Sequence, residues 1–220
     1  MVTVSTHSLW HWVLRLNDLE NLLSSQLSRI FSQAVRSACH KRPFMMDQGP
    51  GDDSMEFGIR QVAVGGLERA ELMQHLAQSG VQLNGFAKQL LEHQIFDELV
   101  PAHNLTLTSR NLQQLGLDAG ATLPQIFERA VSVGLKLCPA YAGPYLRLDF
   151  LDQAASDDSV LSAGKKPDGS LTIASASVGD EDFPRGFYLR VVDEVAWLRG
   201  YRCDDTNGFA LADTFVFRCR

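Results

Sequence analysis

Apolar side chains between residues 55 and 137 recur three and four positions apart, so that each group falls on one face of a helix. Other residues mark the ends of these helices. Asn84 stands at an N-cap position, and Gly80 stands where a glycine with positive φ ends a helix. Short apolar runs between the helices are typical of strands. The predicted elements are helices over 67–78, 84–93, 109–116 and 123–133, and strands over 59–64 and 105–108.

After residue 138 the spacing of apolar residues changes from helical to alternating, which indicates strands with two different faces. Asp193 and Glu194 join two of these segments as a tight hairpin, and a polar loop is expected over 154–169. Helices first and strands second predict an α+β fold, in which a small helical part packs beside a C-terminal antiparallel sheet. The predicted strands cover 145–151, 171–176, 187–192, 195–202 and 214–219.

The first part of the chain has a pattern of its own. Apolar residues over 8–40 predict one long amphipathic helix, and a polar linker follows before residue 55. The chain is therefore divided into an N-terminal helix with its linker (1–54), a mainly helical part (55–137) and an antiparallel β part (138–220). The last two parts can also form one domain over 55–220.

Several interpretations of the N-terminal helix stay open. After Glu20 the helix lacks acidic residues and is rich in serine, as a mitochondrial presequence or a membrane-surface helix is. The favoured interpretations are an ordinary packed helix, or an extended translation start with Met46 or Met55 beginning the compact protein. The apolar stripe is also long enough for self-association with a partner helix.

Charge and hydropathy limit the classes of partner. The net formal charge is −6, and 1–42 carries five basic and two acidic residues, which gives +3 there and leaves −9 for the remainder. An acidic chain binds nucleic acid only through a segregated basic patch, and the predicted helix over 84–93 offers only Lys88 among glutamates. No stretch approaches the roughly 20 apolar residues of a membrane span, and the secretory signal pattern is missing. We expect a cytoplasmic protein that binds no nucleic acid and does not span a membrane.

Motifs for catalysis, metal binding or a cofactor are not found. The cysteines Cys39, Cys138, Cys203 and Cys219 are scattered, without the paired spacing of a zinc site or a disulfide framework, so we expect four free thiols and no cofactor. Cys138 as a nucleophile would need a histidine base brought close by the fold. Its position between Leu137 and Pro139 is more typical of a small core residue.

Arginine and aromatic side chains dominate one face of the predicted sheet. Successive side chains of a strand point to opposite faces, so alternate positions of the predicted strands can be grouped. Such a mixture is typical of interaction surfaces, since arginine stacks on rings and binds carboxylate or phosphate with two parallel N–H groups. The candidate binding residues are Tyr145, Arg147, Asp149, Tyr188, Arg190, Trp197, Arg199, Tyr201 and Arg218.

Two functional hypotheses and one structural alternative follow from this face. The leading hypothesis is a non-enzymatic binding or interaction protein that takes an anionic small molecule or an acidic protein segment. The second is a small hydrolase or transferase with a site built from Arg147, Asp149, Asp152 and Arg190. The structural alternative is a layer that the protein's own helices or long loop cover.

Part of the chain resembles an uncharacterised bacterial protein family of unknown function. The resemblance covers roughly 60–220 and leaves out the N-terminal helix. It implies no activity, cofactor or site residue, and it supports the treatment of 1–54 as an appendage. The stretches that carry it are GVQLNGFAKQLL at 80–91, LGLDAGATLPQIFERAVSVGLKLCP at 115–139, YLRLDFLDQ at 145–153 and GSLTIASASVGDEDFPRGFYLRVVDEVAWLRGY at 169–201.

The division of the chain leads to a first prediction. A chain that begins at Met55 should fold with nearly unchanged stability, because 1–54 is basic overall and is bounded by a polar linker. Thermal unfolding of the short and the full chain measures the difference. A large fall in the melting temperature, or an insoluble short chain, would show that the N-terminal helix belongs to the core.

Overall fold

The computed structural model describes residues 57–156 and 169–220. The chain divides into two units, 1–51 and 52–220, and all described residues belong to the second unit. The predicted N-terminal helix and its linker lie outside the described residues, as does most of the predicted polar loop.

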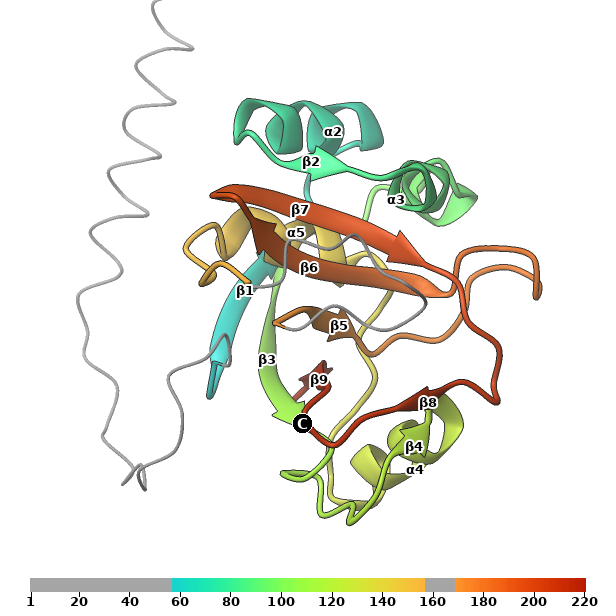
Figure 1. Cartoon of the computed structure of the whole chain (residues 1–220). Coiled ribbons are helices and arrows are strands. Elements are labelled where there is room, and N and C mark those ends of the chain that lie inside the picture. Colours follow the sequence, from blue (N-terminus) through green and yellow to red (C-terminus); the bar gives the residue numbers. More distant parts are fainter. Residues whose placement is uncertain (1–56, 157–168) are drawn as a thin grey trace, which may run out of the picture. The chain divides into compact units, whose positions relative to one another are not determined.

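A mixed sheet of seven strands organises the described part of the chain (Figure 1). A second, two-stranded sheet is formed by β4 (Ala121–Thr122) and β8 (Gly208–Phe209). In spatial order the strands of the large sheet are β1 (Arg60–Val64), β3 (His103–Asn111), β9 (Thr214–Arg218), β5 (Leu171–Ile173), β6 (Gly186–Val192), β7 (Val195–Tyr201) and β2 (Gln82–Leu83). The helices are α2 (Arg69–Gln78), α3 (Gly85–Leu91), α4 (Leu123–Ser132), α5 (Ala142–Asp149) and the short 3₁₀ helix η1 (Gln94–Phe96).

The predicted α+β class is confirmed, but the sheet differs from the predicted C-terminal antiparallel sheet. Strands β1 and β3 from the predicted helical part join it, because β3 pairs with β9 near the end of the chain. Two pairs, β5 with β9 and β2 with β7, are parallel. The spacing of apolar residues along one segment does not determine which distant strand will pair with it. Strand β3 joins the sheet because β9 would otherwise leave the backbone groups of its edge without hydrogen-bond partners.

Both faces of the sheet are covered by apolar side chains. On one face Leu189, Leu198 and Val216 belong to a core that also includes side chains of α2, α3 and α5. On the other face Phe215 and Phe217 pack with side chains of α4. Figure 1 shows α2 and α3 beside β7, and α4 beside the pair of β4 and β8. Strand β6 runs through the middle, and its residues from Gly186 to Val191 are all buried.

The predicted strand over 145–151 is wrong, since these residues form the end of α5 and the turn after it. Alternation misled here because α5 is buried around most of its circumference, so no polar side marks the helical period. Pro144 lies in the first turn, where a missing N–H breaks no bond within the helix. At Gly143 an added Cβ would lie 2.9 Å from the Cβ of Phe187, so glycine lets α5 approach β6 closely.

The predicted helix over 109–116 is also wrong. Strand β3 continues to Asn111 because its last residues pair with β9, and a hydrogen-bonded turn over 112–116 follows. The predicted helices over 67–78, 84–93 and 123–133 are confirmed within a few residues of their ends. The hairpin at Asp193 and Glu194 is confirmed too, with positive φ angles of 50° and 62° at the two residues.

Asn84 fixes α3 to the sheet. Its side-chain oxygen accepts from the N–H of Ala87, as predicted for an N-cap, at 2.9 Å. The same side chain accepts from the N–H of Gly200 at 2.8 Å and donates to the carbonyl of Gly200 at 2.9 Å. One side chain therefore begins α3 and occupies both backbone polar groups of a residue in β7.

The contact between α3 and β7 gives a second prediction. Gly200→Ala should lower the free energy of unfolding by about 1–3 kcal/mol, because the new methyl would lie 2.6 Å from the backbone carbon of Phe86. Gly208→Ala is the matched control, since its new methyl meets no atom within 4 Å. Urea denaturation measures both. Equal stabilities of the two variants would show that α3 is not held against β7.

Candidate functional site

The nine candidate residues do not form one surface. The candidate residues of β6 and β7 lie on one face of the sheet, the same face as Thr172 of β5, which pairs with Tyr188. Other candidate residues lie on α5, which covers the other face. Arg218 pairs with Leu107 of β3 and lies apart from both groups. On β6 and β7 are Tyr188, Arg190, Trp197, Arg199 and Tyr201, and on α5 are Tyr145, Arg147 and Asp149.

Arg199 lies within an aromatic cluster on β6 and β7. Its Nε donates to the hydroxyl of Tyr188 at 2.8 Å, and its guanidinium carbon lies 5.1 Å from the ring centre of Trp197. The rings of Tyr188 and Tyr201 lie 6.3 Å apart. Arg199 and Trp197 are half-buried, so this cluster is partly open to solvent and already uses its arginine internally.

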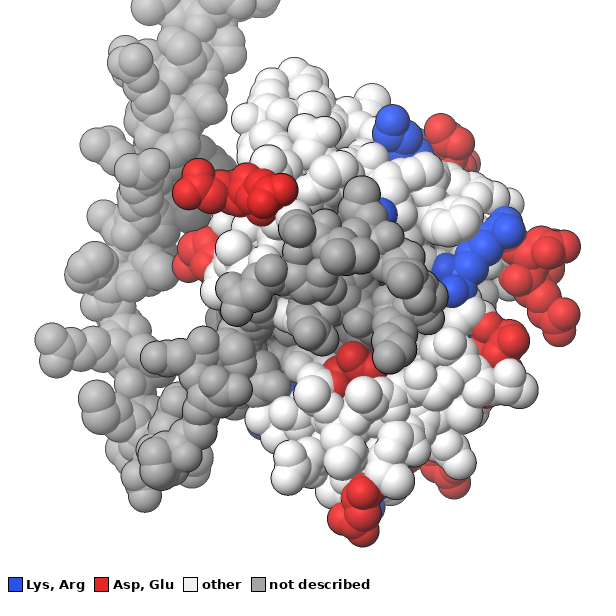
Figure 2. All heavy atoms as spheres, viewed as in Figure 1, with Lys and Arg blue, Asp and Glu red and all other residues white. Residues whose placement is uncertain are grey.

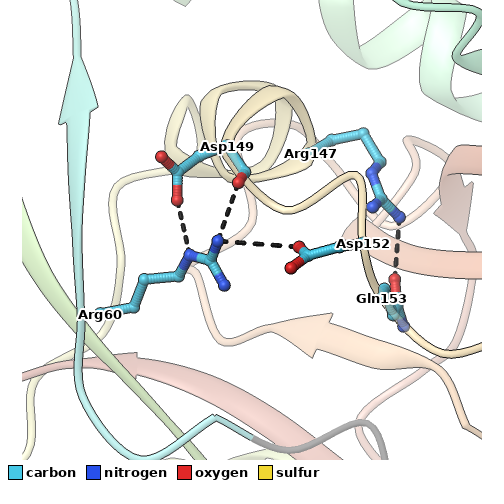
Figure 3. A network of polar contacts seen from close by, with 5 residues as sticks. All are labelled: Arg60, Arg147, Asp149, Asp152 and Gln153. Carbon is cyan, nitrogen blue, oxygen red and sulfur yellow. Dashed lines mark hydrogen bonds and ion pairs between the residues drawn. The ribbon is translucent and has the colours of Figure 1, made fainter. Parts of the chain in front are cut away.

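Arg60, Asp149 and Asp152 form an ion-pair network at the end of α5 (Figure 3). Nε of Arg60 donates to the Asp149 carboxylate at 2.6 Å, and Nη2 donates to the Asp149 carbonyl at 2.9 Å. The carboxylate of Asp152 is 3.8 Å from the same Nη2, and its side chain is 81% exposed. The network therefore fixes Asp149 firmly and leaves Asp152 close to solvent.

Arg147 leaves α5 on another side and points toward Gln153 (Figure 3). The residue is completely buried, with 0% exposure. Its Nη1 donates to the side-chain oxygen of Gln153 at 2.8 Å, and the amide of Gln153 donates to the carbonyl of Gly169 at 3.1 Å. Nε and Nη2 of Arg147 are buried and have no hydrogen-bond partner among the described residues.

Nε and Nη2 form one edge of the guanidinium of Arg147. This edge is open in the sense that neither nitrogen has a hydrogen-bond partner among the described residues, although the side chain is buried. Nε–H and one N–H of Nη2 point the same way along this edge, which is the geometry that receives two oxygens of one anion. Burial lowers the pKa of Arg147 to about 10, while Asp152 opposes this shift and Arg60 adds to it. The group is therefore charged at neutral pH although it is buried.

Two half-buried arginines form ion pairs, unlike Arg147. Arg185 binds the carboxylate of Asp205 at 2.8 Å, and Arg69 binds Asp97. On the face shown in Figure 2, most of the visible basic atoms lie next to acidic atoms, and further acidic atoms lie apart from them. Among the described residues Arg147 combines complete burial with an open guanidinium edge, which singles it out.

The chain that follows α5 connects the two buried arginines of the candidate set. Gln153 binds Arg147, and the Oγ of Ser156 is 3.5 Å from Nη2 of Arg190, which is 1% exposed. The N–H of Ser156 donates to the carbonyl of Val191 at 2.9 Å, so this segment lies against β6. Sequence reasoning missed Gln153 because it belongs to no motif, and it missed Arg60 because the predicted strand over 59–64 is far in sequence from the candidate residues.

A groove of about 720 Å³ lies elsewhere, between the segment after α3, the start of α5 and the segment after β5. Cys138 lines it, but burial raises the pKa of its thiol to about 12. The thiol donates to the carbonyl of Val216 at 3.4 Å and is neutral at ordinary pH, so it lacks the thiolate that a nucleophile needs. The groove is lined by Gln94, Ile95, Asp97, Glu98, Val100, Cys138, Pro139, Ala140, Tyr141, Ala176, Ser177 and Val178.

Over residues 57–156 and 169–220, no group of three or more His, Cys, Asp or Glu side chains is placed to hold a metal ion. Within the same ranges no helix is both long enough and apolar enough to cross a membrane. The chain matches no protein-family model, no curated protein and no solved structure.

The different burial of two candidate arginines gives a third prediction. Arg190→Ala should lower the free energy of unfolding by roughly 2–5 kcal/mol, because it truncates a fully buried side chain. Arg199→Ala should cost about 1 kcal/mol, since the residue is half-buried and loses one hydrogen bond. Urea denaturation of both variants tests this order. Similar losses, or a larger loss for Arg199→Ala, would contradict it.

Proposed function

We propose that the protein is a binding protein for an anionic ligand, which Arg147 receives on its open guanidinium edge. The observation that carries this proposal is a completely buried arginine whose two neighbouring donors, Nε and Nη2, find no partner in the part of the chain that the structure describes. The ligand is an anionic small molecule or an acidic protein segment. Of the nine residues considered from the sequence, the site uses Arg147 directly and Asp149 as part of its frame.

Energetics support a ligand at this position. A buried donor without a partner costs about 1–3 kcal/mol, and more when the group is charged. A protein that needed only packing at this position would be served better by an apolar side chain of similar volume. An anion on the open edge would satisfy both donors and supply the counter-charge at once.

The frame around Arg147 suits binding more than catalysis. Asp149 accepts hydrogen bonds from Arg60 through its carboxylate and its carbonyl, so this carboxylate is already engaged in an ion pair. Gln153 is held by Gly169 on its other side, and this orients the oxygen that accepts from Arg147. Such rigid support for one guanidinium is the preorganisation that an anion site requires.

The proposal includes a cytoplasmic location. The cysteines in the described ranges, Cys138, Cys203 and Cys219, carry free thiols. Free thiols fit a reducing compartment.

A fourth prediction tests the role of Arg147. Arg147→Met should abolish stabilisation of the protein by anionic ligands, because it removes both open donors and keeps an unbranched side chain of similar length. Without ligand, its free energy of unfolding should be unchanged or about 1 kcal/mol higher, since a buried charge is removed. Thermal unfolding across a library of anionic metabolites at constant ionic strength measures the first effect, and urea denaturation measures the second.

Arg199→Met is the matched control, since it makes the same chemical change in a half-buried arginine on the other face of the sheet. It should retain any stabilisation by ligand. The proposal is wrong if Arg147→Met responds to the library as the unaltered protein does. A loss of several kcal/mol in Arg147→Met without ligand would instead assign the arginine to the scaffold.

A further inference from the structure

We infer that the group which Arg147 receives is a singly charged carboxylate, and not a phosphate or a sulfate. This inference rests on the proposed function and names the chemical class of the ligand. Three properties of the site carry it: the shape of the open edge, the charges next to it and the position of Arg147 on its helix.

The open edge offers two N–H groups in one plane. A carboxylate presents two oxygens in one plane and can accept both, as it does in paired contacts with arginine throughout proteins. A phosphate has further oxygens out of this plane that need donors of their own. The nearest side-chain amide, that of Gln153, already donates to the carbonyl of Gly169.

Nearby charges favour one negative charge over two. The carboxylate of Asp149 forms an ion pair with Nε of Arg60 at 2.6 Å, while the side chain of Asp152 is mostly exposed and screened by solvent. The buried charge of Arg147 is therefore left without a close carboxylate, and one negative charge balances it. The charge of Asp152 nevertheless acts on Arg147, where it opposes the lowering of the pKa, so a second negative charge on the ligand would be repelled by Asp152.

The position of Arg147 on α5 also favours a ligand with a single negative charge. Arg147 lies in the last turn of the helix, where carbonyl groups carry partial negative charge. Phosphate sites commonly use the opposite end of a helix, where free N–H groups point at the ligand. A single planar carboxylate needs only the guanidinium edge, and it brings the smallest charge to this end.

Arg147 is sealed from solvent, so a ligand reaches its guanidinium edge only when the neighbouring chain moves aside. The chain next to its partner Gln153 is close to solvent, since Leu151 is 44% exposed and the side chain of Asp152 is 81% exposed. A small carboxylate, or the carboxyl group at the end of a larger ligand, requires less of this movement than a bulky anion.

The test compares four probes on the full chain at constant ionic strength: acetate, methanesulfonate, sulfate and inorganic phosphate. Acetate is planar with one charge, methanesulfonate is tetrahedral with one charge, and the others are tetrahedral with about two. Arginine Nε–H resonances in ¹⁵N NMR spectra report the contact directly, and Arg147→Lys identifies the resonance of Arg147. The unaltered chain and Arg147→Lys are titrated with each probe, with Arg199→Lys as the control.

Acetate should shift the Arg147 resonance in a saturable way and raise the melting temperature of the unaltered chain and of Arg199→Lys. In Arg147→Lys its affinity should fall roughly tenfold or more, because lysine cannot offer two parallel N–H groups. Saturable binding of sulfate or phosphate that requires Arg147, at equal or higher affinity than acetate, overturns the carboxylate assignment and leaves the proposed function intact. Tight binding of methanesulfonate overturns the argument from shape. If no probe shifts the Arg147 resonance, and no anion of the wider library binds through Arg147, the proposed function fails together with the inference.

Discussion

Strand β6 must be covered on both faces, and much of the remaining structure follows from this constraint. It lies inside a sheet whose two faces pack against different helices, so a side chain on either side of it is buried. Glycine at position 143 lets α5 come close enough to cover one face. An arginine on such a strand or on the helix beside it cannot reach solvent freely. Arg190 and Arg147 are therefore buried for a topological reason, whatever their role.

Burial alone does not explain why these arginines differ in their hydrogen-bond and ion-pair partners. Arg60 and Arg199 are anchored by a carboxylate and by a tyrosine hydroxyl. Arg147 has a single amide for its five N–H groups, although Asp149 lies two residues further along the same helix. The helix turns Asp149 toward Arg60 and Arg147 toward Gln153, so proximity in sequence does not create a pair (Figure 3). This division of partners gives the Asp149 carboxylate to Arg60 and leaves Nε and Nη2 of Arg147 without a hydrogen-bond partner among the described residues.

Sequence reasoning succeeded where one local signal fixes the outcome. The helix at 123–132 has one apolar side and a proline in its first turn, and the hairpin at Asp193 and Glu194 has strands of clear alternation around it. It failed for α5, whose burial removes the polar side on which a helical period depends. Arg147 and Asp149 are among the candidate residues, but the alternating pattern placed them on a strand and the structure has them on α5. Their partner Arg60 is 89 residues away from Asp149, and only the assembled sheet brings the two together.

The hydrogen bond from Gln153 to the carbonyl of Gly169 has a consequence for the variation that this fold can accept. It joins Gln153 to Gly169, 16 residues further along the chain, and so fixes these two points next to Arg147. The entropic cost of closing a chain grows only slowly with its length, by about 0.6 kcal/mol for each doubling. Homologous chains can thus insert or delete residues between these two points while the guanidinium keeps its position. Divergence in length would be concentrated there, and the chemistry next to it would be conserved.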